Sequence, residues 1–152
     1  QGGVDDGEDY LTAAYRELKE ETSIKDVKLI QELEGSTTYI LPKHLLGIIW
    51  KGKYKGQKQK WFLMRHINND QEINIKTKNP EFLDWKWIEL DQITDLVVDF
   101  KLNVYKELKE KVKKLQLDIN KKSKLEEKFN QDIEDLSQET ESLVSEIDKW
   151  QM

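Results

Sequence analysis

The chain has 152 residues, of which 36% are charged and 37% hydrophobic, and its formal net charge at pH 7 is -5. This composition favours one domain with an appendage, because it leaves few apolar residues for a second core. The absence of cysteine excludes disulfides and thiol catalysis. No apolar run reaches membrane length and no signal-peptide pattern is present, so we expect a cytoplasmic protein.

An acidic segment near the N-terminus predicts a metal site. Glu17, Glu20 and Glu21 are spaced so that a helix projects all three carboxylates from one face. Such a face repels itself unless a divalent cation is bound. Carboxylate oxygens suit Mg²⁺ or Mn²⁺, which also bind substrate phosphates. The alternative is an ordinary solvated helix face.

The loop that precedes this helix is predicted to approach a phosphate and to cap the helix. Gly2 and Gly3 allow the backbone to approach a phosphate closely, and Asp9 is a predicted N-cap. We expect Arg16 to pair with Glu8. That pair would brace the loop against the helix without ligating a metal itself.

The same residues resemble the signature of the Nudix hydrolases: Gly2, Glu8, Arg16-Glu17, an aliphatic residue and Glu20-Glu21. The resemblance implies an α/β fold, an α/β/α sandwich with a mixed sheet. One position departs from the pattern, because Ser23 stands where the family usually has a glycine that ends the helix in a left-handed conformation. We therefore expect an adjusted helix end. The chain starts directly at the motif, so the resemblance also implies missing N-terminal strands and exposed strand edges.

Beyond the motif helix the sequence predicts short strands and one short helix. Apolar or β-branched segments predict strands at residues 27–33, 36–41, 45–50 and 59–66. Alternating tryptophans predict one more strand at residues 85–90. Asp91 is predicted to cap a short helix that runs through Val97.

Further segments resemble the bacterial RNA pyrophosphohydrolases, in the same order and out to about Val112. These enzymes convert the 5′ triphosphate of RNA to a monophosphate, and close relatives hydrolyse dinucleoside polyphosphates. The resemblance thus implies RNA 5′-end processing in mRNA decay, with release of pyrophosphate or phosphate. The alternatives are a dinucleoside polyphosphate hydrolase, or an inactive truncated module with a binding role. The segments are 39–43, 56–63, 72–74, 80–82 with Trp85 and Trp87, and 97–101.

Individual residues follow from this resemblance. Glu81 matches a carboxylate that joins the helix glutamates at the metals, which makes Glu17, Glu20, Glu21 and Glu81 the expected catalytic residues and metal ligands. Bound metals would neutralise the polyphosphate and lower the pKa of an attacking water. The general base is left open among Glu20, Glu21 and Glu81.

The resemblance also implies an RNA path. Phe100 matches an aromatic residue that stacks on the first base, while Tyr39 and Lys101 match positions that line the path. The structural alternatives are a core position for Phe100 and strand packing for Tyr39.

A basic stretch, residues 51–60, contains five lysines and no acidic residue. Lys58 and Lys60 are candidate phosphate contacts that would position RNA without reading its sequence. The alternative is a solvated hairpin loop. His44 and His66 are expected to be structural or surface residues.

The C-terminal third predicts a long helix with a heptad repeat. We expect a bend, kink or loop near residues 120–123, with Ser123 and Glu126 forming the capping box of a second helix. A coiled coil or helical hairpin would support self-association or a protein partner; otherwise the helix folds back on the enzyme. The predicted domains are 1–115 and the extension 116–152. Heptad positions are Tyr105, Leu108, Val112, Leu115, Ile119, Phe129, Ile133, Leu136, Leu143, Ile147 and Trp150, with exceptions at Lys122, Glu126 and Thr140.

Overall fold

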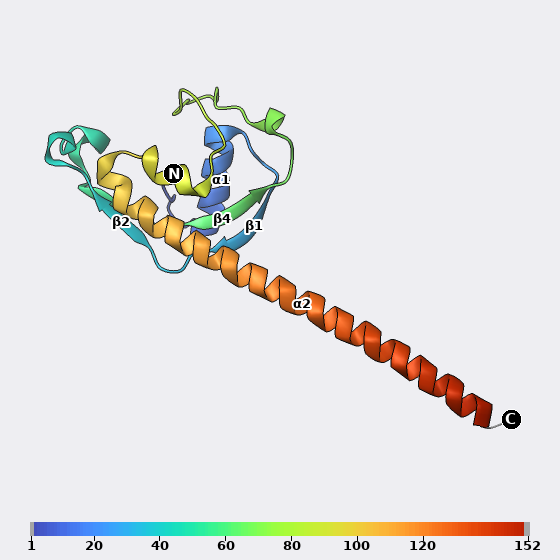
Figure 1. The fold of residues 1–152 in the computed structure, drawn as a ribbon. Helices are drawn as coiled ribbons and strands as arrows, with labels where there is room; N and C mark the ends of the chain where they lie inside the picture. Colours follow the sequence, from blue (N-terminus) through green and yellow to red (C-terminus); the bar gives the residue numbers. More distant parts are fainter. Residues whose placement is uncertain (1, 151–152) are drawn as a thin grey trace. The chain divides into compact units, whose positions relative to one another are not determined.

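The computed structural model describes residues 2–150, and the chain divides into two compact units. One unit ends at Lys111 and the other begins at Val112. Helix α1 (Tyr10–Thr22), the strands and the first turns of helix α2 (Leu102–Trp150) belong to the first unit (Figure 1). The remainder of α2 forms the second. The α/β class with a long C-terminal helix is confirmed, whereas the boundary at residue 115 stays a prediction.

Helix α1 begins and ends at residues that the motif predicts. The Asp9 carboxylate accepts the backbone N–H groups of Leu11 and Thr12, each at 3.0 Å, and the Thr12 hydroxyl at 2.6 Å. The hydroxyl is the main cause of the lowered pKa of Asp9. At the other end Ser23 has φ 65° and donates its N–H to the Lys19 carbonyl. The expected adjustment is therefore wrong, because Ser23 itself takes the left-handed conformation.

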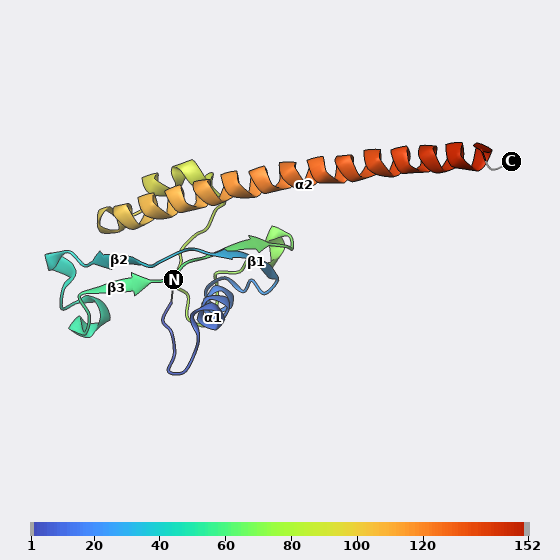
Figure 2. The same cartoon turned by 90° about the horizontal axis from the view of Figure 1, so that it is seen from below.

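Two antiparallel strand pairs follow α1. Strand β1 (Val27–Glu32) pairs with β4 (Phe62–His66), and β2 (Thr37–Ile40) pairs with β3 (Gly56–Gln59). Between the two pairs the Leu33 N–H donates to the Trp61 carbonyl at 2.9 Å, which links them into one long ribbon (Figure 2). At the far pair Gly56 is needed, because a Cβ there would lie 2.1 Å from the Tyr39 carbonyl oxygen.

Three of the strand predictions are confirmed, and two are wrong. Residues 45–50 do not form a strand but lie in a loop with the 3₁₀ turns η1 (Lys43–Leu45) and η2 (Ile49–Gly52). Their apolar side chains imitate a buried strand, yet Ile48 is 73% exposed. Residues 85–90 likewise have no strand in the described structure, and Trp87 is 61% exposed.

Two further elements differ from the sequence predictions. The short helix is η4 (Leu90–Asp95), and its N-cap is Glu89 rather than Asp91. Glu89 and Gln92 exchange side-chain-to-backbone hydrogen bonds as a capping box, which leaves Asp91 inside the turn. Strand β3 was not predicted, because its sequence Gly-Gln-Lys-Gln offers no apolar residue to alternate with polar ones.

The core of the first unit is small. Along β2, Thr37 and Tyr39 are buried while Thr38 and Ile40 are exposed, so one face of the ribbon packs inward. At the start of α2 the buried side chains are Val104 and Leu108. Trp61 connects strand β2 with the start of α2. Its indole N–H donates to Thr37 Oγ1 at 2.7 Å, and its ring lies edge-on to Tyr105 at a centroid distance of 5.9 Å. Heptad positions 105 and 108 therefore pack in the core of the first unit.

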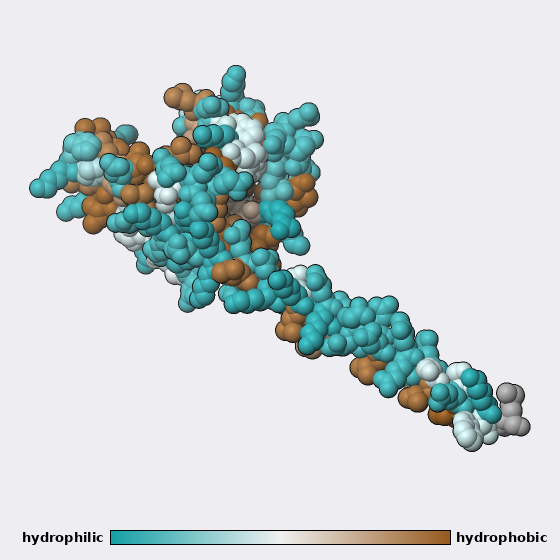
Figure 3. All heavy atoms as spheres, in the orientation of Figure 1, coloured by the Kyte–Doolittle hydropathy of each residue, from teal (hydrophilic) through white to brown (hydrophobic). Residues whose placement is uncertain are grey.

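The second unit is a single stretch of helix. The predicted bend and the Ser123 capping box are wrong, because α2 continues without interruption through these residues. No glycine or proline is present to break it. Large apolar side chains, including Phe129, Ile133 and Leu136, are more than half exposed along it (Figure 3). Among the described residues, no helix is long and apolar enough to span a membrane.

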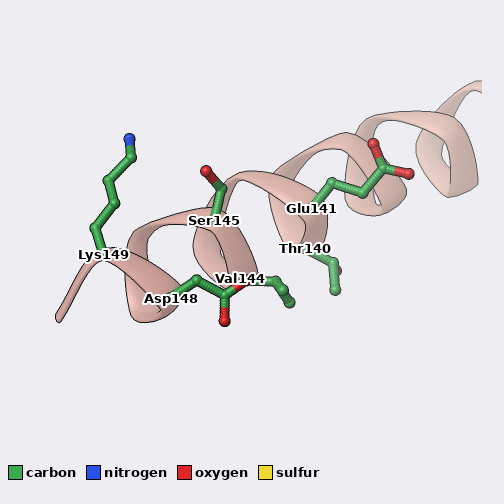
Figure 4. Close-up of a pocket in the computed structure, with 6 residues that line it drawn as sticks. All are labelled: Thr140, Glu141, Val144, Ser145, Asp148 and Lys149. Atoms are coloured by element: carbon green, nitrogen blue, oxygen red, sulfur yellow. The ribbon is translucent and has the colours of Figure 1, made fainter. Parts of the chain in front are cut away.

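A shallow hollow lies near the end of this helix (Figure 4). Its lining comes from α2 alone: Thr140, Glu141, Val144, Ser145, Asp148 and Lys149. The Thr140 hydroxyl donates to the Leu136 carbonyl at 2.8 Å, which satisfies that group within the helix. The hollow is thus a space between side chains on successive turns, and we assign no chemistry to it.

Candidate active site

Arg16 is the centre of the motif, and its predicted pairing with Glu8 is confirmed. The guanidinium makes a two-pronged contact: Nε donates to Glu8 Oε1 at 2.9 Å and Nη2 to Oε2 at 2.8 Å. This hydrogen bonding is the largest cause of the lowered pKa of Glu8, and the Asp5 backbone N–H adds to it at 3.1 Å. In turn, Glu8 and then Glu17 raise the pKa of Arg16. Both partners therefore stay charged at neutral pH.

Arg16 also reaches two of the predicted metal ligands. Its Nη1 donates to Glu17 Oε1 at 2.8 Å and to Glu20 Oε2 at 3.2 Å. Its Nη2 additionally donates to the Gly3 carbonyl oxygen at 2.8 Å. One side chain thus fastens the N-terminal loop and two acidic residues of α1 together.

The two glycines of the loop have different roles. A Cβ at Gly2 would lie 1.6 Å from the Glu17 carboxyl carbon, so any other residue would force the Glu17 carboxylate to move away from this position. A Cβ at Gly3 would meet no atom within 4 Å. The close approach predicted for Gly2 is therefore present, toward Glu17. The approach of either residue to a phosphate stays a prediction.

The acidic helix face suits a divalent cation by its chemistry. Glu17, Glu20 and Glu21 lie on the single helix α1, where their spacing puts hard oxygen donors on one face. In the described part of the chain, however, no three acidic, histidine or cysteine side chains are already arranged around one point. Glu17 and Glu20 instead direct oxygens toward Arg16. The residues fit the metal by type and position, and ligation stays a prediction.

Glu81 lies apart from this network in the described contacts. It is exposed in the segment between η3 (Asp70–Glu72) and η4, which has no regular secondary structure. Its role at the metals stays a prediction that rests on the resemblance alone. No spacing in the sequence connects it with α1.

Three residues of the expected RNA path are brought together, and we call them the Tyr39 cluster: Tyr39, Phe100 and Lys101. The ring centroids of Tyr39 and Phe100 are 5.6 Å apart, and Lys101 Nζ lies 5.0 Å from the Tyr39 centroid. Strand β2 supplies the first residue and the 3₁₀ turn η5 (Asp99–Lys101) the other two. Residues from two distant parts of the chain thus form one basic and aromatic group.

The position of Tyr39 within the cluster is also that of a packing residue. Its side chain is buried, and its hydroxyl donates to Gln57 Oε1 at 2.8 Å on the neighbouring strand. Burial raises the pKa of Tyr39. Gln57 could not be predicted from the sequence, because the contact appears only once the register of β2 and β3 is known.

The two lysines of the basic stretch differ in their surroundings. Lys58 is exposed on β3, opposite Thr38. Lys60 donates to Glu32 Oε1 at 2.6 Å, so its charge is partly compensated. A phosphate would have to compete with Glu32 for Lys60, which makes Lys58 the better placed of the two predicted contacts.

The histidines lie outside the acidic network. The His66 ring stacks on Trp87 at a centroid distance of 6.3 Å, and its Nε2 lies 3.3 Å from the Asn69 carbonyl oxygen. These contacts give it a packing role. His44 is exposed in η1.

Comparison with known proteins agrees with the motif and the fold. The NUDIX domain matches residues 1–108. An RNA pyrophosphohydrolase of Pelagibacter ubique is 72% identical over 115 residues, which cover 76% of this chain and 73% of that protein. RNA pyrophosphohydrolases of Dinoroseobacter shibae and Rhodospirillum rubrum are 46% and 44% identical, over 71% of this chain and 69% and 66% of their own lengths. The chain therefore belongs to the Nudix family, and its first unit contains the motif that defines the family's hydrolases.

Proposed function

We propose that this chain is an RNA pyrophosphohydrolase, which converts the 5′ triphosphate of RNA to a 5′ monophosphate and releases pyrophosphate or phosphate. The observation that carries the proposal is the presence, in one unit, of the acidic helix and the Tyr39 cluster. The acidic helix provides carboxylates that would hold a divalent cation at the phosphoric anhydride. The Tyr39 cluster provides an aromatic ring and the Lys101 ammonium group for contact with a nucleotide. The names of the similar proteins support the same substrate.

The glutamates of this chain would bind the metal and accept the proton. Glu17, Glu20 and Glu21, with Glu81, would hold a divalent cation, Mg²⁺ or Mn²⁺. When bound, the cation supplies charge neutralisation and a water of lowered pKa. Glu20, Glu21 or Glu81 accepts the proton of the attacking water as its oxygen bonds to phosphorus and the P–O anhydride bond breaks.

The remaining residues position these groups and the substrate. Arg16 and Glu8 keep the N-terminal loop against Glu17. Phe100 offers a stacking face to the first base, worth about 1–3 kcal/mol in comparable sites. Lys101 adds positive charge beside it, held over the Tyr39 ring.

The test is product release from a short 5′-triphosphorylated RNA with Mg²⁺ or Mn²⁺. We expect release by the wild type, loss in Glu20→Gln and Glu21→Gln, and loss on chelation. Glu127→Gln, at an exposed position of α2, is the matched control and should keep full activity. Diadenosine tetraphosphate as a competing substrate separates the RNA enzyme from a dinucleoside polyphosphate hydrolase. If the wild type is folded, as judged by its near-ultraviolet circular dichroism, and still releases no pyrophosphate or phosphate, the chain is a binding module and not a hydrolase.

We also propose that the second unit associates with a second copy of itself in antiparallel orientation. Lys122 and Glu126 interrupt the apolar heptad stripe. A parallel pair would place each beside its own copy, like charge against like. An antiparallel pair brings Lys122 to the partner's Glu126, with Ile119 beside the partner's Phe129.

Charge reversal tests this arrangement. Lys122→Glu should weaken the dimer measured by sedimentation, because it sets two acids together. The double variant Lys122→Glu with Glu126→Lys should restore it. A monomeric wild type, or a double variant that dimerises no better than the single variant, would contradict the proposal.

A cytoplasmic location is proposed from the substrate, since bacterial RNA is made there.

A further inference from the structure

The loop between β2 and β3 concentrates positive charge and carries two aromatic rings, the exposed Tyr54 and the half-buried Trp50. This loop, residues 41–55, is closed at its base, where the Leu41 N–H donates to the Lys55 carbonyl at 2.8 Å. Tyr54 is 53% exposed and Ile48 73% exposed. No acidic residue occurs between Glu34 and Asp70, although the whole chain has a net charge of -5. The loop's exposed lysines are Lys43, Lys51, Lys53 and Lys55.

The backbone of the loop is strained at two neighbouring residues. Trp50 and Lys51 have φ 52° and φ 55°, the left-handed region that residues with a Cβ rarely adopt. Each such residue costs about 1 kcal/mol or more, and the strain persists only where surrounding contacts fix it. Backbone strain of this kind is concentrated at functional sites.

Ring contacts give the strained turn a defined shape. The rings of Trp50 and Tyr54 meet edge to face at 6.5 Å and 73°. Lys53 Nζ lies 5.2 Å from the Tyr54 centroid. Gly52 closes the turn, since a Cβ there would lie 3.1 Å from the Gly47 Cα. The result is a compact group of two rings with Lys53 over one of them.

We propose that this loop binds the single-stranded RNA that follows the 5′ end, with Trp50 and Tyr54 stacking on bases and Lys51, Lys53 and Lys55 contacting phosphates. The inference rests on the proposed function and extends it to a second RNA contact. Aromatic rings interleaved with lysines are the combination that binds single strands without sequence preference.

The place of the loop in the fold supports this assignment. Tyr39 lies on β2, and the loop begins two residues later at Leu41, about 7 Å along an extended strand. An RNA whose first base stacks in the Tyr39 cluster would therefore need only a few nucleotides to reach the loop. Apolar residues with lysines also occur in proteins that bind anionic membranes, and the experiment distinguishes the two.

The first experiment compares two lengths of substrate. Hydrolysis of a 5′-triphosphorylated dinucleotide and of a 5′-triphosphorylated RNA of about ten nucleotides is measured for wild type, Tyr54→Ala and the triple variant Lys51→Gln, Lys53→Gln, Lys55→Gln. We expect kcat/KM on the longer RNA to fall by about 5- to 50-fold, and by at least about fivefold more than on the dinucleotide. The control is Lys121→Gln, Lys124→Gln, Lys128→Gln in α2, which removes the same charge and should have no effect. Equal losses on both substrates, or no loss, would overturn the inference.

The second experiment measures binding without chemistry. Fluorescence anisotropy with a 5′-hydroxyl RNA reports the loop even if hydrolysis is absent, so the proposed function and this inference can fail separately. The salt dependence, log K against log salt, should become shallower by about 2 in the triple loop variant, since each single-strand phosphate contact contributes about 0.7. RNA binding that is the same in wild type and loop variants would refute the inference. Loop-dependent binding to phosphatidylglycerol vesicles alone would assign the loop to a membrane instead.

Discussion

The substitution Tyr39→Phe tests whether the Tyr39 hydroxyl only stabilises the fold or also contacts the substrate. Tyr39→Phe deletes the hydroxyl that donates to Gln57 Oε1 at 2.8 Å, while the ring beneath Lys101 and beside Phe100 remains. Gln57 Oε1 keeps a weak donor, the Gln59 amide at 3.4 Å. A typical net hydrogen bond contributes about 0.5–1.5 kcal/mol, so we expect a loss of about 1 kcal/mol in the free energy of unfolding.

A loss of about 1 kcal/mol in the free energy of unfolding lowers Tm by a measurable amount. For a unit of roughly 110 residues the unfolding entropy is about 0.23 kcal/mol/K, which gives a fall in Tm of about 4 °C. Tryptophan fluorescence is the appropriate probe, because far-ultraviolet dichroism is dominated by α2. Hydrolysis of 5′-triphosphorylated RNA should change by less than about tenfold, or 1.4 kcal/mol, at a temperature where both proteins are folded, because the deleted hydroxyl donates to Gln57 and the ring remains.

A second substitution at the same position provides the contrast. Tyr39→Leu removes the ring, and with it an aromatic pair worth about 0.5–1.5 kcal/mol and a cation–π contact worth about 0.5–1 kcal/mol. We expect kcat/KM to fall about 5- to 50-fold as Phe100 and Lys101 lose their support. If Tyr39→Phe loses activity by tenfold or more with an unchanged Tm, the hydroxyl contacts substrate and the packing argument is refuted.

Three further predictions concern the motif. Gly2→Ala should displace the Glu17 carboxylate, because its Cβ would lie 1.6 Å from the carboxyl carbon, and lower kcat at least about tenfold, whereas Gly3→Ala should not; equal effects of the two in the RNA assay would contradict this. Because the folded-state pKa of Glu8 is below its ordinary value of 4.5, its pair with Arg16 stabilises the fold above that pH and is lost as the pH falls through the lowered value. Thermal unfolding of Glu8→Gln should therefore depend less on pH in this acid range than that of wild type, and parallel curves would exclude the linkage. Ser23→Gly should relieve the left-handed strain and raise the free energy of unfolding by up to about 1 kcal/mol, while Ser23→Ala, which keeps the strain and loses the hydroxyl contact to the Asn74 carbonyl, should lower it in urea titrations.

Much of the first unit follows from local sequence patterns. The Asp9 cap, α1 and the Arg16–Glu8 pair depend on residues near one another in the chain, where side-chain geometry is nearly fixed by helix spacing. The strands β1, β2 and β4 were likewise visible as β-branched and apolar segments.

The remaining features depend on contacts between distant residues or on exposure. Residues 45–50 read as a strand because hydrophobicity was taken to mean burial, yet they form an exposed loop. The polar strand β3 exists because β2 is its partner, and no local signal reveals that. In the site, the two carboxylates that turn toward Arg16 were predicted only to face a cation, because helix spacing fixes the direction of a side chain and not the position of its last atoms.

The continuity of α2 has a consequence for how its distal half forms. Initiating a helix is unfavourable, since several residues are fixed for the first hydrogen bond, whereas each added residue extends it at little cost. Here the first turns carry Val104 and Leu108, which are buried in the enzyme core. The core therefore supplies the nucleus, and the exposed residues beyond Val112 need only propagate from it. In the monomer, amide hydrogen exchange should then become progressively faster toward Trp150.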